Sequence, residues 1–286
     1  EHLDGEKWSF RVKIRKGESF LGMREFSLQH PKTRNFILEY IYHLLLKDET
    51  VPSLRYDFIT FRLNGKNLGT YALEEHFDKL LIEDNRLREG PIIKLSEDRM
   101  WLDFARETKI FGHHINLKMV QDKGPYISEI STFNPKRSLK EGYQENQYLL
   151  AKSILNEFLE GKRSVAETFE LKPTAKYFAI NDLLAITHAT AWHNMRFYFN
   201  PITARLSPIG FDAYPLTRPS RKESRDLSAD RNVLGLFEDK LFLEEYISQL
   251  EKVSEKSYLD NFFYKNSTSI EKALNKLQRN YPFVRI

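Results

Sequence analysis

Apolar and polar residues alternate in several short segments of the amino-terminal part of the chain, as they do in half-buried β-strands. Two of these segments, residues 56–63 and 68–75, flank the dipeptide Asn64-Gly65, which is typical of a tight hairpin turn. From residue 34 to 47 apolar residues recur at helical spacing and predict an amphipathic helix. The other elements predicted here are strands at residues 8–14, 25–28 and 91–95 and a helix at residues 77–88.

The periodicity weakens between residues 98 and 135, where the clearest signal is a strand candidate at residues 115–120. Helical spacing dominates afterwards, interrupted by a two-stranded hairpin predicted at residues 192–212 and by a charged loop at residues 222–230. The predicted helices lie at residues 140–159, 165–169 and 173–187, with at least two more between residues 240 and 281.

This order, sheet first and helices afterwards, predicts an α+β protein of two unequal lobes with a cleft between them. An antiparallel-sheet lobe would occupy residues 1–97. A mainly helical lobe would occupy residues 98–286 and include the hairpin and the helical tail.

The composition supports a folded protein and excludes several classes of site. Hydrophobic residues make up 41% of the 286 residues and aromatic residues 13%, which is enough for a sizeable core. The 44 basic residues nearly balance the 40 acidic ones, so we expect no protein whose main task is to hold duplex nucleic acid. Cysteine is absent, which excludes disulfides, thiolate metal sites and cysteine nucleophiles. No apolar run approaches the length of a membrane span.

The hairpin at residues 192–212 carries the strongest candidate chemistry. Asn194 lies at its loop end and Asp212 at the end of its return strand. Two oxygen ligands at one end of a hairpin suit a hard cation such as Mg²⁺ and, through it, the phosphates of a nucleotide. The same residues could instead cap local turns, and spacing alone slightly favours capping.

Glu75 is a candidate partner for a phosphate-binding lysine, either Lys13 or Lys94, and the alternative is an ordinary surface charge at a strand end. The histidines do not favour a zinc site, because His113 and His114 would point to opposite faces of a strand and no HExxH spacing is present. No G-x-S-x-G segment supports a serine hydrolase.

Several segments together resemble the CotH family of spore-coat kinases, in order along nearly all of the chain. The most specific are residues 63–78, with an Asn-Gly turn, a Gly-x-Tyr and a glutamate before a helix, and the hairpin from Asn194 to Asp212. Residues 8–14 with 26–28, and the lysine-ending strand at residues 91–94, are similar to further family segments.

The resemblance implies an atypical protein-kinase fold that uses ATP and Mg²⁺ to transfer a phosphoryl group to Ser or Thr of a protein substrate. Glu75 would be the amino-lobe glutamate, and Lys94 or Lys13 the phosphate lysine. Asn194 and Asp212 would be the metal ligands.

One position departs from the pattern of active kinases. Ala189 stands five residues before Asn194, where a kinase-like loop would hold the aspartate that accepts the hydroxyl proton. The protein could use His188 or His193 as the base, could recruit Asp182, or could bind nucleotide without transferring phosphate. The competing interpretation is a catalytically silent module, a pseudokinase, that binds a nucleotide or a partner in the cell envelope or coat.

The chain begins at Glu1 rather than at methionine, so we expect its start to be trimmed, and any export signal or anchor would lie in the missing part. Together with the settings in which the resembled family occurs, this leads us to expect an extracytoplasmic or cell-envelope location.

Overall fold

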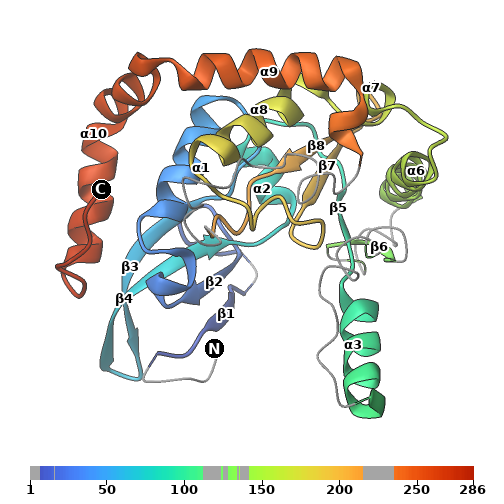
Figure 1. The fold of residues 1–286 in the computed structure, drawn as a ribbon. Coiled ribbons are helices and arrows are strands. Elements are labelled where there is room, and N and C mark those ends of the chain that lie inside the picture. The colour runs from blue at the N-terminus through green and yellow to red at the C-terminus, as the bar shows by residue number, and fades with distance from the viewer. Residues whose placement is uncertain are drawn as a thin grey trace.

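A computed structural model describes residues 7–15, 17–111, 124, 128–133, 135, 142–214 and 235–286. The protein is a mixed α+β structure with two four-stranded antiparallel sheets and several helices (Figure 1). The predicted α+β class is therefore confirmed. Among the residues described, none of the helices combines the length and the apolar character that a membrane crossing requires.

The first sheet contains four of the five strands predicted in the amino-terminal part of the chain, and the fifth, predicted at residues 91–95, belongs to the second sheet. Its strand order is β1-β2-β4-β3, and its strands are β1 (Phe10–Lys13), β2 (Glu25–Gln29), β3 (Tyr56–Leu63) and β4 (Lys66–Glu75). The turn between β3 and β4 is formed by Asn64 and Gly65, whose φ angles are 50° and 81°. Positive φ at both central residues is what a two-residue hairpin turn of the favoured hand requires, so the predicted hairpin is confirmed.

The two helices of this part are shorter than predicted. The 3₁₀ helix η1 (Pro31–Arg34) and α1 (Leu38–Asp48) replace one continuous helix, because Asn35 and Phe36 adopt positive φ between them. Helix α2 (Lys79–Asp84) begins after Asp78, whose side chain accepts hydrogen bonds from the first turn.

The second sheet joins distant parts of the chain. Its strand order is β6-β5-β7-β8, with β5 (Ile92–Leu95), β6 (Ile130–Thr132), β7 (Arg196–Asn200) and β8 (Arg205–Ile209). The hairpin predicted at residues 192–212 supplies β7 and β8. The sequence pattern missed β6, and it missed α3 (Asp98–Phe111), which extends away from the rest of the molecule in Figure 1. The strand candidate at residues 115–120 and the loop at residues 222–230 lie outside the described residues.

The later part of the chain is mainly helical, as predicted. Its helices are α6 (Gly142–Leu159), α7 (Val165–Thr168), α8 (Leu171–Leu183), the 3₁₀ helix η2 (Leu236–Glu238), α9 (Lys240–Ser254) and α10 (Lys256–Gln278). Helix α10 runs beside β3 and α1 at the edge of the first sheet (Figure 1).

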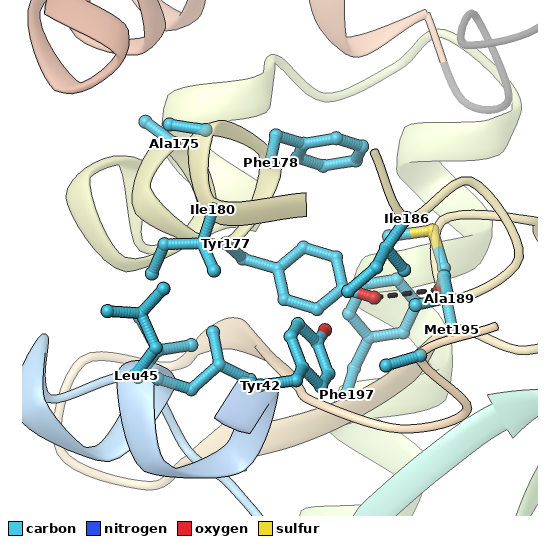
Figure 2. Close-up of a cluster of buried hydrophobic side chains, with 14 of the residues drawn as sticks. Tyr42, Leu45, Ala175, Tyr177, Phe178, Ile180, Ile186, Ala189, Met195 and Phe197 are labelled. Atoms are coloured by element: carbon cyan, nitrogen blue, oxygen red, sulfur yellow. Dashed lines mark hydrogen bonds between the residues drawn. The ribbon is translucent and has the colours of Figure 1, made fainter. Parts of the chain in front are cut away.

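One large hydrophobic core connects the amino-terminal and carboxy-terminal elements. Figure 2 shows Tyr42 and Leu45 of α1 facing Tyr177 and Ile180 of α8. The same cluster continues through β5 to α9 and α10. The predicted boundary between two lobes at residue 97 stays a prediction, but β5 and β7 pair across it and the core is continuous there.

Candidate functional site

Asp212 lies just beyond β8, in a backbone position set by close packing against α1. Gly210 lies two residues before Asp212, and a Cβ on Gly210 would overlap Leu46 and crowd Tyr42. The amide of Gly210 also donates to the carbonyl of Pro52. Asp212 itself has a positive φ of 58°, a conformation that aspartate tolerates better than most residues. The end of β8 is therefore fixed against α1, and the side chain of Asp212 is buried.

The Asp212 carboxylate contacts a guanidinium and an imidazole. Its Oδ1 lies 2.8 Å from Nη1 of Arg34, and its Oδ2 lies 3.3 Å from Nε2 of His188. Burial alone would raise the pKa of Asp212, but the hydrogen bond from His188 and the charge of Arg34 outweigh burial and lower it. Asp212 is therefore ionised at neutral pH. Within the described part of the chain its Oδ1 accepts no well-aligned hydrogen bond, despite the ionic contact with Arg34.

Arg34 bridges Asp212 and a second buried carboxylate. Its Nε lies 3.2 Å from Oε2 of Glu74, and its guanidinium lies over the ring of Phe211 at 5.4 Å from the ring centre. Gln29 donates to the same oxygen of Glu74. Burial raises the pKa of Glu74, although the charge of Arg34 opposes that shift. One cation thus compensates two carboxylates that come from the two different sheet regions.

Glu39 of α1 holds the backbone next to Asp212. Its Oε2 accepts a 2.6 Å hydrogen bond from the amide of Ala213, and its Oε1 lies 3.0 Å from Nε2 of His43. The other ring nitrogen of His43 accepts from the amide of Leu54. Since Glu39 is fully buried, this chain of hydrogen bonds ties the loop after β8 to α1 and to the start of β3.

Asn194 is linked to Asp212 by His188, which contacts both residues. Its side-chain amide donates to the carbonyl of His188 at 3.1 Å, and its backbone amide donates to Ala191. Asn194 therefore stabilises the local turn, as the capping interpretation expected. His188 contacts both Asn194 and Asp212, so the two predicted metal ligands share a neighbour.

Two cations line the adjacent strands of the second sheet. Lys94 of β5 lies opposite Arg196 of β7, and both charges lie near the ring of Phe133, at 5.5 and 5.8 Å from its centre. Arg196 also lies over Phe211 at 4.9 Å and donates to the carbonyl of His193. Burial lowers the pKa of Arg196 to about 10 and, with the charge of Arg196, also lowers the pKa of Lys94.

The predicted pairing of Glu75 with Lys13 or Lys94 is wrong for this structure. Glu75 forms an ion pair with Arg55, while Lys13 lies on the first sheet with its side chain 77% exposed and 3.6 Å from Glu25. Neighbouring residues of a strand point to opposite faces, and here Glu74 rather than Glu75 faces the group around Asp212.

The three predicted bases lie in different surroundings. His188 contacts Asp212, and the ring of His193 lies 6.0 Å from that of His188. Burial lowers the pKa of His193, which keeps it neutral at pH 7. Asp182, at the end of α8, instead accepts a hydrogen bond from the hydroxyl of Tyr246 on α9.

Ala189 is a core residue in this fold. Its side chain is fully buried, and its carbonyl accepts a 2.7 Å hydrogen bond from the hydroxyl of Tyr177 (Figure 2). Ile186 and Met195 pack in the same cluster. The surroundings of residue 189 are therefore apolar, and they do not suit an ionised carboxylate.

Sequence reasoning missed four charged residues of the site: Arg34, Glu39, Glu74 and Arg196. Of these four, only Arg196 could have been considered from the sequence, because it lies within the predicted hairpin, two residues after Asn194. Across the described residues no group of three or more His, Asp or Glu side chains is arranged to hold a metal. A cation at Asp212 would therefore need further ligands from Asn194, water or a phosphate.

Comparison with known proteins identifies one family. A sequence model of the family described as "CotH kinase protein" matches residues 2–214, which include both sheets and Asp212. No curated protein matches the chain. The match ends before η2, α9 and α10, so these helices lie outside it.

Proposed function

The chain belongs to the CotH kinase protein family, and on this premise we propose that it transfers a phosphoryl group from ATP to Ser or Thr of a protein substrate, with Mg²⁺ as cofactor. Family membership indicates a kinase-like role, and a kinase-like arrangement of two lobes belongs to the proposal. The observation that carries it is the Asp212 carboxylate, which is buried, ionised and incompletely hydrogen-bonded at the end of the hairpin.

Asp212 and Asn194 are the residues we propose to hold Mg²⁺. The chemistry of a carboxylate and an amide oxygen fits this ion, and the Oδ1 atom without a hydrogen bond supports the fit. When bound, Mg²⁺ supplies positive charge to the transferring phosphates. Arg34 contacts the same oxygen, so a cation at Oδ1 has to share it with Arg34 or displace it.

Lys94 and Arg196 are the proposed phosphate-binding cations. They lie opposite each other on β5 and β7, and β7 belongs to the hairpin that carries Asp212. Burial and the charge of Arg196 lower the pKa of Lys94, and an anionic ligand beside this lysine would favour its charged form. The position of Lys13 on the other sheet favours Lys94 for this role.

His188 is the proposed base. Oδ2 of Asp212 lies 3.3 Å from Nε2 of His188, and a carboxylate in this position orients an imidazole ring for proton transfer. His193 is the second candidate, because burial keeps it neutral and able to accept a proton. Asp182 is less favoured, since its carboxylate is hydrogen-bonded to Tyr246.

The burial of Ala189 favours a second candidate function, a nucleotide- or partner-binding module without transferase activity. The usual position of the catalytic aspartate is part of the core here. The two functions differ in phosphoryl transfer but share the binding site around Asp212.

Calorimetric titration with ATP and Mg²⁺ tests the binding site. We expect the native chain to bind, Asp212→Asn to bind at least about tenfold more weakly, and Asp57→Asn to bind normally. Asp57 is a suitable control because its carboxylate is also paired with a cation, Lys276, on another face. Unchanged binding by Asp212→Asn would remove the metal assignment.

A radiolabelled-phosphate assay for autophosphorylation and for transfer to a Ser- and Thr-rich protein tests the reaction. Transfer that is lost in His188→Ala but not in Asp182→Asn supports the proposed base. Nucleotide binding without any transfer supports the binding module instead. Loss only in His193→Ala assigns the role to His193.

A further inference from the structure

A sizeable cavity lies away from Asp212. It has a volume of about 370 Å³ and lies between α1, the start of β3 and α10. Pockets that hold small organic ligands have volumes of about 300–1,000 Å³. One wall belongs to α10, so part of the cavity is built by the segment beyond the residues that match the family.

The lining combines an apolar wall with positive charge. Tyr40, Leu44 and Leu54 provide apolar and aromatic surface. Four cationic side chains line the cavity against two carboxylates, those of Asp57 and Asp84. The cations are Lys47, Arg55, Lys272 and Lys276. Glu75 adds a third carboxylate, because it pairs with Arg55, so one positive charge is left over. A positive charge beside an apolar wall suits a ligand with a hydrophobic body and a negative group.

The cations differ in how far the protein neutralises them. Arg55 forms an ion pair with Glu75, and Nζ of Lys47 lies 3.5 Å from Oδ2 of Asp84. Lys272 is exposed at the rim and forms no ion pair within the parts of the chain that the structure describes. By contrast, Lys276 is neutralised by Asp57 at 2.6 Å. A negative ligand group at Lys272 would therefore not compete with a carboxylate of the described residues.

We propose that this cavity binds a small organic anion, with its apolar part between Tyr40 and Leu54 and its negative group at Lys272. The site is separate from the proposed nucleotide site and does not depend on it. One wall residue, His43, is hydrogen-bonded to Glu39, which holds the amide of Ala213 next to Asp212. A ligand in the cavity therefore contacts the hydrogen-bond chain that positions Asp212.

Fluorescence titration with anilinonaphthalene sulfonate, an aromatic anion, tests the proposal. Its uncharged parent, phenylnaphthylamine, is the matched probe for the apolar contribution alone. We expect saturable one-to-one binding of the sulfonate and weaker binding of the parent. Lys272→Glu should weaken binding of the sulfonate about fivefold, which is the effect of one partly exposed charge contact.

Arg279→Glu is the control for Lys272→Glu, because it makes the same charge change on the same end of the chain but does not line the cavity. Ser269→Trp, at an exposed lining position of α10, should block both probes without affecting folding. Circular dichroism and the urea midpoint confirm that each variant is folded.

Three results would overturn the proposal: equal binding of the two probes, equal effects of Lys272→Glu and Arg279→Glu, or binding that Ser269→Trp leaves unchanged. Displacement of the sulfonate by saturating ATP and Mg²⁺, together with insensitivity to Lys272→Glu, would place the probe in the nucleotide site and also refute it. Every probe titration is also carried out without ATP. The result for the cavity therefore does not depend on whether the protein transfers phosphate.

Discussion

Replacing Arg34 by methionine tests the arrangement of charges around Asp212. The substitution keeps a long apolar side chain over Phe211 but leaves Glu74 and Asp212 without the cation that lies 3.2 and 2.8 Å from them. Breaking a buried ion pair by removing one partner costs about 3–5 kcal/mol. The Arg34 side chain is 16% exposed and Gln29 still donates to Glu74, so we expect a loss in the free energy of unfolding near the lower limit, about 3 kcal/mol.

The loss should depend on pH in a definite direction. Burial already raises the pKa of Glu74, and without Arg34 this pKa rises further above its value in the unfolded chain. A carboxyl with a raised pKa contributes stability at low pH and loses it as pH rises through the folded pKa. The variant should therefore be destabilised more at pH about 8 than at pH about 5.5, measured by urea unfolding at both values.

Arg55→Met is the matched control, because Arg55 also pairs with a buried carboxylate, that of Glu75, and is 20% exposed. Both variants should lose stability, but only Arg34→Met exposes Asp212 to a competing cation. Mg²⁺ should therefore raise the melting temperature of Arg34→Met more than that of Arg55→Met. A loss smaller than about 1 kcal/mol at pH about 8, or the same loss at both pH values, would refute the charge arrangement described here.

Three further predictions concern the core, the phosphate site and the effect of pH. Ala189→Asp should lower the free energy of unfolding by about 3 kcal/mol or more instead of creating a base, because the surroundings of residue 189 beside Tyr177 are apolar. Urea unfolding measures this loss. A stable variant with new transfer activity would contradict the prediction. Lys94→Met should weaken nucleotide binding about tenfold while Lys13→Met leaves it unchanged, as measured by calorimetry, and equal effects would contradict the choice of lysine. When the pH falls from about 7 to 5.5, His193→Gln should lose less stability than the native chain. Burial lowers the pKa of His193, so the unfolded chain takes up a proton at this residue at a higher pH than the folded chain does. Urea midpoints that fall equally with pH in the variant and the native chain would contradict this.

Local patterns accounted for most of the secondary structure. The alternation at residues 56–63 and 68–75 and the Asn64-Gly65 turn are short-range signals, and the structure forms β3 and β4 there. Element ends were less accessible: α1 starts later than predicted because Asn35 and Phe36 adopt positive φ. Strand β6 has three residues, which is too short for a periodic signal.

Local sequence patterns did not predict which charged residues pair with one another. Alternation implies that Glu74 and Glu75 point to opposite faces of a strand, but it does not say which face meets Arg34 and which meets Arg55. Lys13 and Lys94 were equivalent as lysines at strand ends until the second sheet placed Lys94 beside Arg196.

The sequence by itself determined the α+β class, the hairpin that ends at Asp212 and the family, because these depend on neighbouring residues and on short motifs. Tertiary structure alone decided that Arg34 bridges Glu74 and Asp212 and that Ala189 belongs to the core. Such contacts join residues far apart in the chain, and their strength depends on burial, which a linear pattern does not contain.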